Sequence, residues 1–199
     1  MILGVIPARL NSTRFPSKVI FPLKGKPIIE HVYEKALQSK LLNKVIVAVD
    51  SEETRNVINC QNIIMTSDKH QSGTDRVAEV ADNFDCDVVV NIQGDEPGIN
   101  PLLIDQLIQL FEDPFVEMAS IASTDLKEND LNNDNVVKVN LDEENNAISF
   151  IRNNLNPEST YYRHIGIYAY RKNTLNLFTS LSQSDNEKNH RLEQLRALD

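Results

Sequence analysis

Two short polar segments carry the side chains best suited to chemistry. The first, residues 70–76 with the sequence HQSGTDR, leads through one glycine into a helical pattern. The second, residues 91–97 with the sequence NIQGDEP, closes an apolar run that begins at Val88. Ligands of open α/β sheets bind at the carboxyl ends of the strands. A carboxylate at that position, beside basic loops, suggests a binding site for a metal ion that holds phosphates.

Three cations follow the first expected strand, at Arg9, Arg14 and Lys18. An arginine can bind two phosphate oxygens at once, whereas a lysine acts as a point charge. The small residues Ser12 and Thr13 lie between them, so the loop favours a triphosphate over solvated surface charge. The chain has neither a Walker-type glycine loop nor a G-x-G-x-x-G motif, which argues against a P-loop or dinucleotide-binding fold.

Each motif also has a structural interpretation. Residues 72–76 alone are typical of a helix cap with a glycine turn. Asp95 and Glu96 could form an exposed turn, but their place after a buried strand favours contact with a ligand. His164 alone would more often be structural. Strand alternation, however, puts it on one face with Gly166 and Tyr168, which suggests a ligand lying against the sheet.

The first half of the chain alternates strands with helices. Strands are predicted at residues 2–7, 45–49, 63–65 and 88–92. Helices are predicted after Pro27 and from Glu52, and a third runs from an N-cap at Thr74 to about Asn83. Another helix is predicted to begin at Pro101. This order predicts an α/β fold with a mostly parallel sheet and helices on both of its faces.

The second half is richer in strands. Further strands are predicted at residues 118–122, 137–141, 147–152 and 165–171, and helices at 174–181 and 188–198. The acidic, Asn-rich residues 126–135 are predicted to form a surface loop or a short helix. Because no linker or repeat interrupts the chain, one domain is predicted over residues 1–199.

Composition excludes several classes of function. The chain has 199 residues and a net charge of −9, which argues against bulk nucleic-acid binding. No apolar run approaches the roughly 20 residues of a membrane span, and the first residues do not resemble a signal peptide. Only two cysteines occur, Cys60 and Cys86, so a reducing cytoplasm is the expected setting. Cys86 borders an expected strand and is predicted to be a core residue.

Taken together, these segments resemble the 3-deoxy-manno-octulosonate cytidylyltransferase family, also called the CMP-KDO synthetases. The matching segments span nearly the whole chain in the expected order: residues 6–9, 12–16, 25–27, 70–76, 91–97, 163–168 and 192–196. The resemblance implies a Rossmann-like nucleotidyltransferase fold with a smaller β-rich, sugar-binding part. The implied reaction joins CTP and the acidic sugar KDO to give CMP-KDO and diphosphate, for lipopolysaccharide biosynthesis. It also implies Mg²⁺ as cofactor, a cytoplasmic location and a homodimer.

The same resemblance assigns roles to individual residues. It implies that the triphosphate is bound by Arg9, Arg14 and Lys18, and that the residues near the cytidine are Ser72, Arg76 and Gln93. Asp95 is the implied Mg²⁺ ligand and, with Arg9 and Lys18, one of the three implied catalytic residues. The implied sugar-binding residues are Arg152, His164, Tyr168, Glu193 and Gln194.

The sequence departs from the family pattern in three places. Ser17 and Val19 stand where Gly and Pro are common, and residues 56–64 form a shorter connection than usual. The chain ends at Asp199, before the tail in which family members carry a second metal-binding Asp. Two alternatives therefore remain open: a truncated, catalytically impaired paralogue that binds nucleotide, and a cytidylyltransferase for another acidic sugar.

Overall fold

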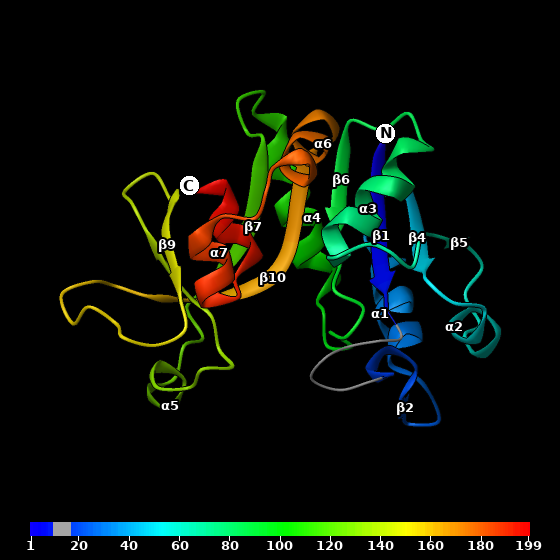
Figure 1. Cartoon of the computed structure of the whole chain (residues 1–199), viewed down its shortest axis with the longest axis horizontal. Helices are drawn as coiled ribbons and strands as arrows, with labels where there is room; N and C mark the ends of the chain where they lie inside the picture. Colours follow the sequence, from blue (N-terminus) through cyan, green and yellow to red (C-terminus); the bar gives the residue numbers. More distant parts are fainter. Residues whose placement is uncertain (10–16) are drawn as a thin grey trace. The chain divides into compact units, whose positions relative to one another are not determined.

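The computed structural model describes residues 1–9 and 17–199, which form two compact units (Figure 1). The first unit comprises Met1–Ala119 and Ile167–Thr179, and the second comprises Ser120–Gly166 and Ser180–Asp199. The chain passes from one unit to the other inside strands β7 (Met118–Ser123) and β10 (Tyr162–Arg171) and at the end of helix α6 (Lys172–Ser180). Because these passages lie in strands and a helix rather than in polar linkers, the sequence pattern did not reveal the division.

The sheet of the first unit has the order β5-β4-β1-β6-β10. Four of its strands are parallel: β1 (Ile2–Ala8), β4 (Lys44–Val49), β5 (Ile63–Met65) and β6 (Val88–Asn91). The last part of β10 runs antiparallel to β6, with Tyr168 opposite Asn91. The sheet is therefore mixed, and the parallel arrangement predicted from the sequence holds for the alternating first half of the chain.

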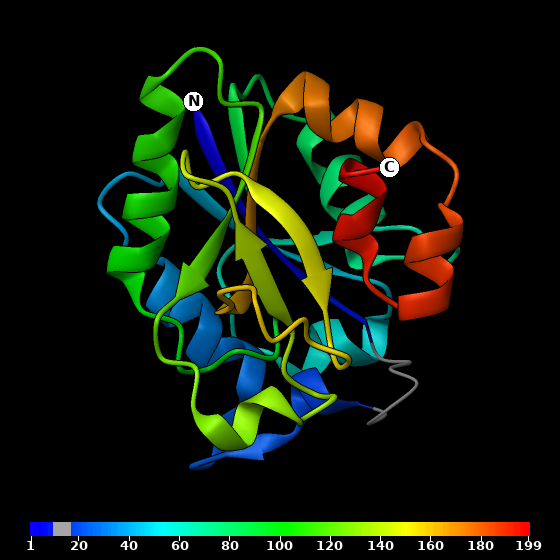
Figure 2. The same ribbon diagram turned by 90° about the vertical axis from the view of Figure 1, so that its left-hand side faces the viewer.

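Helices cover both faces of this sheet (Figure 1, Figure 2). On one face, apolar residues of α3 (Gly73–Asp82) and α6 (Lys172–Ser180) form a core with Leu3, Val5 and other strand residues. The opposite face packs on α1 (Ile28–Ala36) and α4 (Pro101–Gln109). Cys86 belongs to the first of these cores, which confirms its predicted burial. The remaining elements of this unit are short: η1 (Lys18–Ile20), β2 (Pro22–Leu23), β3 (Lys26–Pro27), α2 (Glu52–Val57) and η2 (Leu110–Glu112).

The start of α3 differs from the sequence prediction. The N-cap is Ser72 rather than Thr74, because Ser72 has an extended backbone and its hydroxyl accepts from the backbone N–H of Asp75 at 3.1 Å. The carboxylate of Asp75 accepts in return from the N–H of Ser72 at 2.9 Å, which completes a capping box. Thr74 is buried inside the first turn and accepts from the side-chain amide of Asn91.

In the second unit, β8 (Lys138–Leu141) pairs antiparallel with β9 (Ala147–Ile151) and with the first residues of β10 (Figure 2). A short helix, α5 (Glu128–Leu131), precedes these strands, and two more follow them, α7 (Asp185–His190) and η3 (Glu193–Ala197). The prediction of one helix over residues 188–198 was wrong, because Arg191 adopts a left-handed conformation with φ of 55° and ends α7. The small core contains Val139, Phe150, Leu192 and Leu195.

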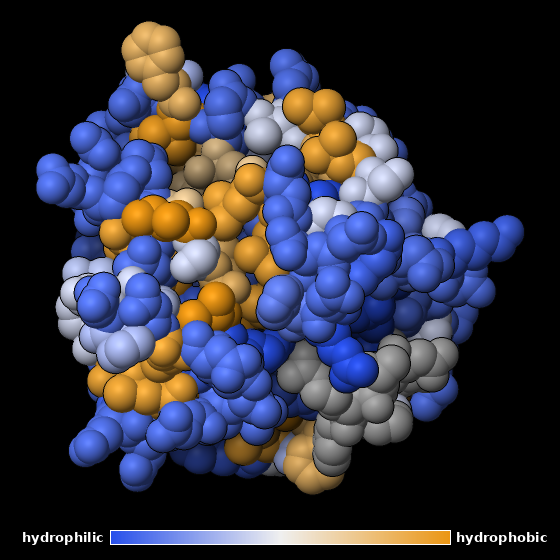
Figure 3. All heavy atoms as spheres, turned by 60° about the vertical axis from the view of Figure 1, so that its left-hand side comes forward, coloured by the Kyte–Doolittle hydropathy of each residue, from blue (hydrophilic) through white to orange (hydrophobic). Residues whose placement is uncertain are grey.

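Most of the visible surface is hydrophilic, with apolar side chains exposed between the polar ones (Figure 3). The most exposed large apolar residue among those described is Phe115, at 88%. Among the described residues, no helix has the length and apolar character needed to cross a bilayer.

Gly94, in the turn after β6, occupies a position where a side chain does not fit. A Cβ there would lie 2.8 Å from the carbonyl oxygen of Pro7, which is backbone and cannot yield without moving β1. A Cβ at Gly73, in contrast, would meet only the side chain of Pro7, at 3.4 Å. Glycine at 94 therefore lets the turn approach the end of β1.

We predict that Gly94→Ala lowers the free energy of unfolding by about 1–3 kcal/mol, the usual cost of overpacking. Gly73→Ala is the matched control and should change it by less than about 0.5 kcal/mol. Urea denaturation of both variants measures the difference. Equal stability of the two variants would contradict the close approach.

Candidate active site

The carboxyl ends of the parallel strands bring several of the predicted residues to one edge of the first unit. Arg9 follows β1, and residues 93–95 follow β6. Ser72 lies at the N-terminus of α3, beside the same edge, because Pro7 in β1 contacts the position of Gly73. Ligands of open α/β sheets bind at this edge.

Lys18 and Asp95 form an ion pair at this edge. The ammonium nitrogen of Lys18 lies 2.7 Å from Oδ2 of Asp95, although 77 residues separate them in the chain. Their side chains are 42% and 43% exposed. Exposed pairs of this kind contribute little to stability, typically about 0–1 kcal/mol. Both groups are instead accessible to a charged ligand.

Arg9 is exposed and reaches the segment that precedes α3. Its Nη1 donates to the carbonyl oxygen of Gln71 at 3.1 Å. The hydroxyl of Ser72 accepts one hydrogen bond from the helix backbone, which leaves its O–H donor and one lone pair for a further contact. Arg9 and Ser72 thus lie close together, as the proposed triphosphate and cytidine contacts require.

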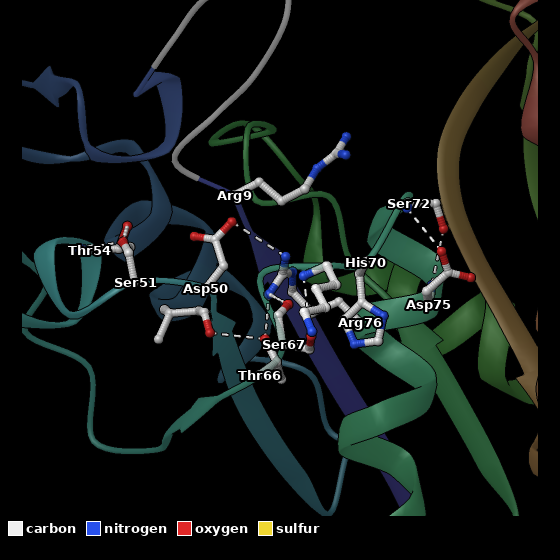
Figure 4. Close-up of polar contacts among 12 residues, drawn as sticks. Arg9, Asp50, Ser51, Thr54, Thr66, Ser67, His70, Ser72, Asp75 and Arg76 are labelled. Carbon is white, nitrogen blue, oxygen red and sulfur yellow. Dashed lines mark hydrogen bonds and ion pairs between the residues drawn. The ribbon is translucent and has the colours of Figure 1, made fainter.

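Arg76, in contrast, has no exposed surface. Its guanidinium donates to the Thr66 hydroxyl, to the carbonyl oxygen of Ser67 at 3.2 Å and to Asp50 Oδ2 at 3.3 Å (Figure 4). Burial lowers the pKa of Arg76, and Asp50 partly offsets this. Arg76 therefore ties α3 to the ends of β4 and β5. Its predicted place near the cytidine stays a prediction, and any such contact would need the guanidinium to become exposed.

Glu79, one turn further along α3, holds the same segment. Its carboxylate accepts from the backbone N–H of Ser67 at 3.0 Å and pairs with Nε2 of His70. Burial alone would raise the pKa of Glu79, but these two hydrogen bonds and the nearby charges of His70 and Arg76 together outweigh it, and the pKa lies below its usual value. Neither Asp50 nor Glu79 was among the site residues predicted from the sequence. For Asp50 a signal existed, since it directly follows a buried strand.

The other predicted nucleotide and sugar residues of the first unit differ in what surrounds them. Gln93 is half-buried in the turn after β6. Tyr168 lies opposite Asn91 on β10, and its ring stacks on that of Tyr170. Arg14 lies outside the described residues.

His164 is half-buried within the second unit. Its Nε2 lies 2.8 Å from the hydroxyl of Ser120, and its ring meets that of Phe150 edge-on with centroids 4.9 Å apart. Burial lowers the pKa of His164 to about 4. The imidazole is therefore neutral at pH 7 and can donate one hydrogen bond and accept another.

The remaining predicted sugar residues also belong to the second unit. Nη1 of Arg152 donates to the carbonyl oxygen of Asp134 at 2.8 Å. Glu193 and Gln194 open η3, where a buried Arg196 binds both carboxylate oxygens of Glu187 at 2.7 and 2.8 Å. Arg196 also lies 3.9 Å from Glu193. A buried, bidentate ion pair thus fixes the short helix that carries these two residues.

Comparison with known proteins identifies the family. A family model described as cytidylyltransferase matches residues 3–199. The 3-deoxy-manno-octulosonate cytidylyltransferase of Pelobacter propionicus is 40% identical, over 100% of this chain and 85% of its own. The enzyme of the same name from Chloroherpeton thalassium is 42% identical, over 98% of this chain and 84% of its own. The chain belongs to the 3-deoxy-manno-octulosonate cytidylyltransferase family.

Solved structures agree with this membership. A CMP:2-keto-3-deoxy-manno-octonic acid synthetase complexed with CTP matches with a TM-score of 0.91 and 36% identity, over 99% of this chain and 85% of that one. A cytidylyltransferase from Leptospira borgpetersenii matches with a TM-score of 0.63 at 16% identity, which supports the fold alone. The α/β nucleotidyltransferase fold expected from the sequence is confirmed.

The pKa of His164 predicts a pH dependence of stability. An unfolded histidine titrates near pH 6.5, so between about pH 6.5 and 4 the unfolded chain binds a proton that the folded chain excludes. The free energy of unfolding should therefore decrease as the pH is lowered through this window. The decrease should be up to about 3 kcal/mol, because burial lowers the pKa of His164 to about 4.

Unfolding in urea at pH 7 and pH 4.5 checks this expectation. His164→Gln should flatten the pH dependence. The exposed His190 of the same unit provides the control, and His190→Gln should leave the dependence unchanged. Identical pH dependence in the His164→Gln variant and the original chain would contradict the burial of a neutral imidazole.

Proposed function

We propose that this chain transfers the cytidylyl group of CTP to 3-deoxy-manno-octulosonate, giving CMP-KDO and diphosphate for lipopolysaccharide biosynthesis. The anomeric hydroxyl of the sugar attacks the α-phosphorus, the bond to the β-phosphate oxygen breaks, and the hydroxyl proton is lost. No covalent intermediate with the protein is needed. The protein's task is to position two anions and offset their repulsion.

The observation that carries this proposal is the exposed Lys18–Asp95 pair at the carboxyl edge of the sheet. A nucleoside triphosphate needs a cation for its oxygens, and a metal ion on those oxygens needs a carboxylate. The pair supplies both groups, 2.7 Å apart, in a chain of a cytidylyltransferase family. In the proposed complex Lys18 and Arg9 contact the triphosphate, and Ser72 and Gln93 lie near the cytidine.

The residues present suit Mg²⁺. Asp95 and its neighbour Glu96 are exposed, and no group of three His, Cys, Asp or Glu side chains converges among residues 1–9 and 17–199. Mg²⁺ bound with a nucleotide usually takes only one or two carboxylates and completes its shell with phosphates and water. We assign Asp95 as the protein ligand. The ion would neutralise charge on the phosphates during displacement.

The sugar is assigned to the second unit and to Tyr168. Arg152 suits the sugar carboxylate because a guanidinium can bind both of its oxygens. The neutral His164 and the residues Glu193 and Gln194 suit sugar hydroxyls, since together they offer hydrogen-bond donors and acceptors. We further propose that the chain works in the cytoplasm as a homodimer. Light scattering of the purified chain tests the dimer.

Diphosphate release with Mg²⁺ and combinations of nucleotide and sugar tests the function. CTP with KDO should support turnover, whereas ATP or GTP should not. Faster turnover with a sialic acid would favour a cytidylyltransferase for another acidic sugar. Tight CTP binding without turnover of any sugar would favour the catalytically impaired alternative.

Asp95→Asn should lower Mg²⁺-dependent turnover by about a hundredfold or more, because it removes the charge assigned to the metal. Glu96→Gln is the adjacent control and should cost less than about threefold. Steady-state rates across a Mg²⁺ titration measure both. If Glu96→Gln proves the more damaging change, Glu96 is the metal ligand instead.

A further inference from the structure

Lys138, on β8, is buried, and its ammonium group donates to backbone carbonyl oxygens. Its side chain has no exposed surface, although lysine is one of the residues least often found inside proteins. β8 lies between β9 and the first residues of β10, with Lys138 opposite Ile151 on one side and Arg163 on the other. A buried ammonium is costly unless its hydrogen-bond donors are used.

The ammonium group uses those donors to join two segments of the second unit. It donates to the carbonyl oxygen of Asn133 at 2.9 Å and to that of Arg152, which comes directly after β9. Both partners are backbone atoms. Replacing a side chain of the loop would therefore not release them, whereas replacing Lys138 would release both at once.

Arg152 closes the network from the other side. Its Nη1 donates to the carbonyl oxygen of Asp134, the residue after Asn133, and its Nη2 lies 3.5 Å from the carbonyl oxygen of Arg191. The Asn153 side chain adds a bond of 3.1 Å to the carboxylate of Asp134. Lys138 thus fixes the backbone of Arg152 and also fixes the loop on which the Arg152 guanidinium rests.

The charges around Lys138 are compatible with this placement. Burial lowers the pKa of Lys138, the carboxylates of Asp134 and Asp130 raise it, and the positive charge of Arg152 lowers it again. The two carboxylates therefore oppose the effect of burial, and each acts on the ammonium group more strongly than Arg152 does.

We propose that Lys138 is a positioning residue for Arg152, and that it sets the affinity for the carboxylate of the acidic sugar without touching the sugar. The proposal rests on the proposed function, because it takes Arg152 as the group that meets that carboxylate. A guanidinium binds a carboxylate bidentately only when its plane is held in register. A displacement of about 1 Å is enough to lose much of that interaction.

The test compares Lys138→Met with the original chain by steady-state kinetics. The KM for KDO should rise about tenfold or more, while the KM for CTP changes less than about twofold. Lys172→Met is the matched control. Its ammonium also donates to a backbone carbonyl, that of Phe84 at 2.7 Å, but in the first unit and with no part in the sugar assignment. It should leave the KM for KDO unchanged.

A double-mutant cycle separates positioning from a general loss of packing. If Lys138 acts through Arg152, then adding Lys138→Met to Arg152→Ala should raise the KM for KDO no further than Arg152→Ala alone. If the two substitutions raise the KM for KDO by factors that multiply in the double variant, the proposal is overturned. An unchanged KM for KDO in Lys138→Met would overturn it as well. Should that variant fail to fold, Lys138→Gln, which keeps a donor, should raise the KM for KDO by a smaller factor and again only when Arg152 is present; an unchanged KM for KDO would overturn the proposal. Absence of KDO turnover in the original chain would instead refute the proposed function itself.

Discussion

The parallel run of β1, β4 and β6 is the constraint on which the nucleotide half of the site depends. Strands that run in the same direction end at the same edge, so residues far apart in the chain meet there without any direct attraction between them. The turn after β6 can approach the end of β1 only because Gly94 has no side chain. The exposed pair of Lys18 and Asp95 depends on that arrangement and contributes little to holding it.

Buried charges serve a different purpose from exposed ones in this protein. Arg76 and Lys138 have no exposed surface, and Arg196 has very little. Each is surrounded by carbonyl oxygens, hydroxyls or carboxylates that belong to segments without regular structure or to short helices. Burying a charge is expensive, and removing its partners is more so, which makes these residues firm anchors for loops. Exposed charges such as Arg9, Lys18 and Asp95 remain available for ligands.

The distinction between buried, structural charges and exposed, ligand-accessible charges helps to interpret the segment at residues 70–76. Residues 70–76 carry part of the sequence resemblance to the family, yet their side chains have separate structural roles: Ser72 caps α3, Asp75 completes the capping box, and Arg76 ties the helix to Asp50 and Thr66. A motif shared by a family can therefore be a set of structural requirements that shape a binding surface. Its side chains need not all contact the ligand.

The sequence by itself determined the family, the alternating first half and most of the residues at the strand ends. It could do so because buried parallel strands are continuous apolar runs, and because the turn and cap residues beside them are chemically distinctive. Only the tertiary structure decided which charges are buried. In the sequence, Lys138 has the pattern of an exposed polar residue in an alternating strand, but it is buried. Nothing in the sequence around Arg191 predicts the left-handed backbone that ends α7 there. Burial and turn conformation both depend on packing between segments far apart in the chain, and spacing along the sequence carries no record of such packing.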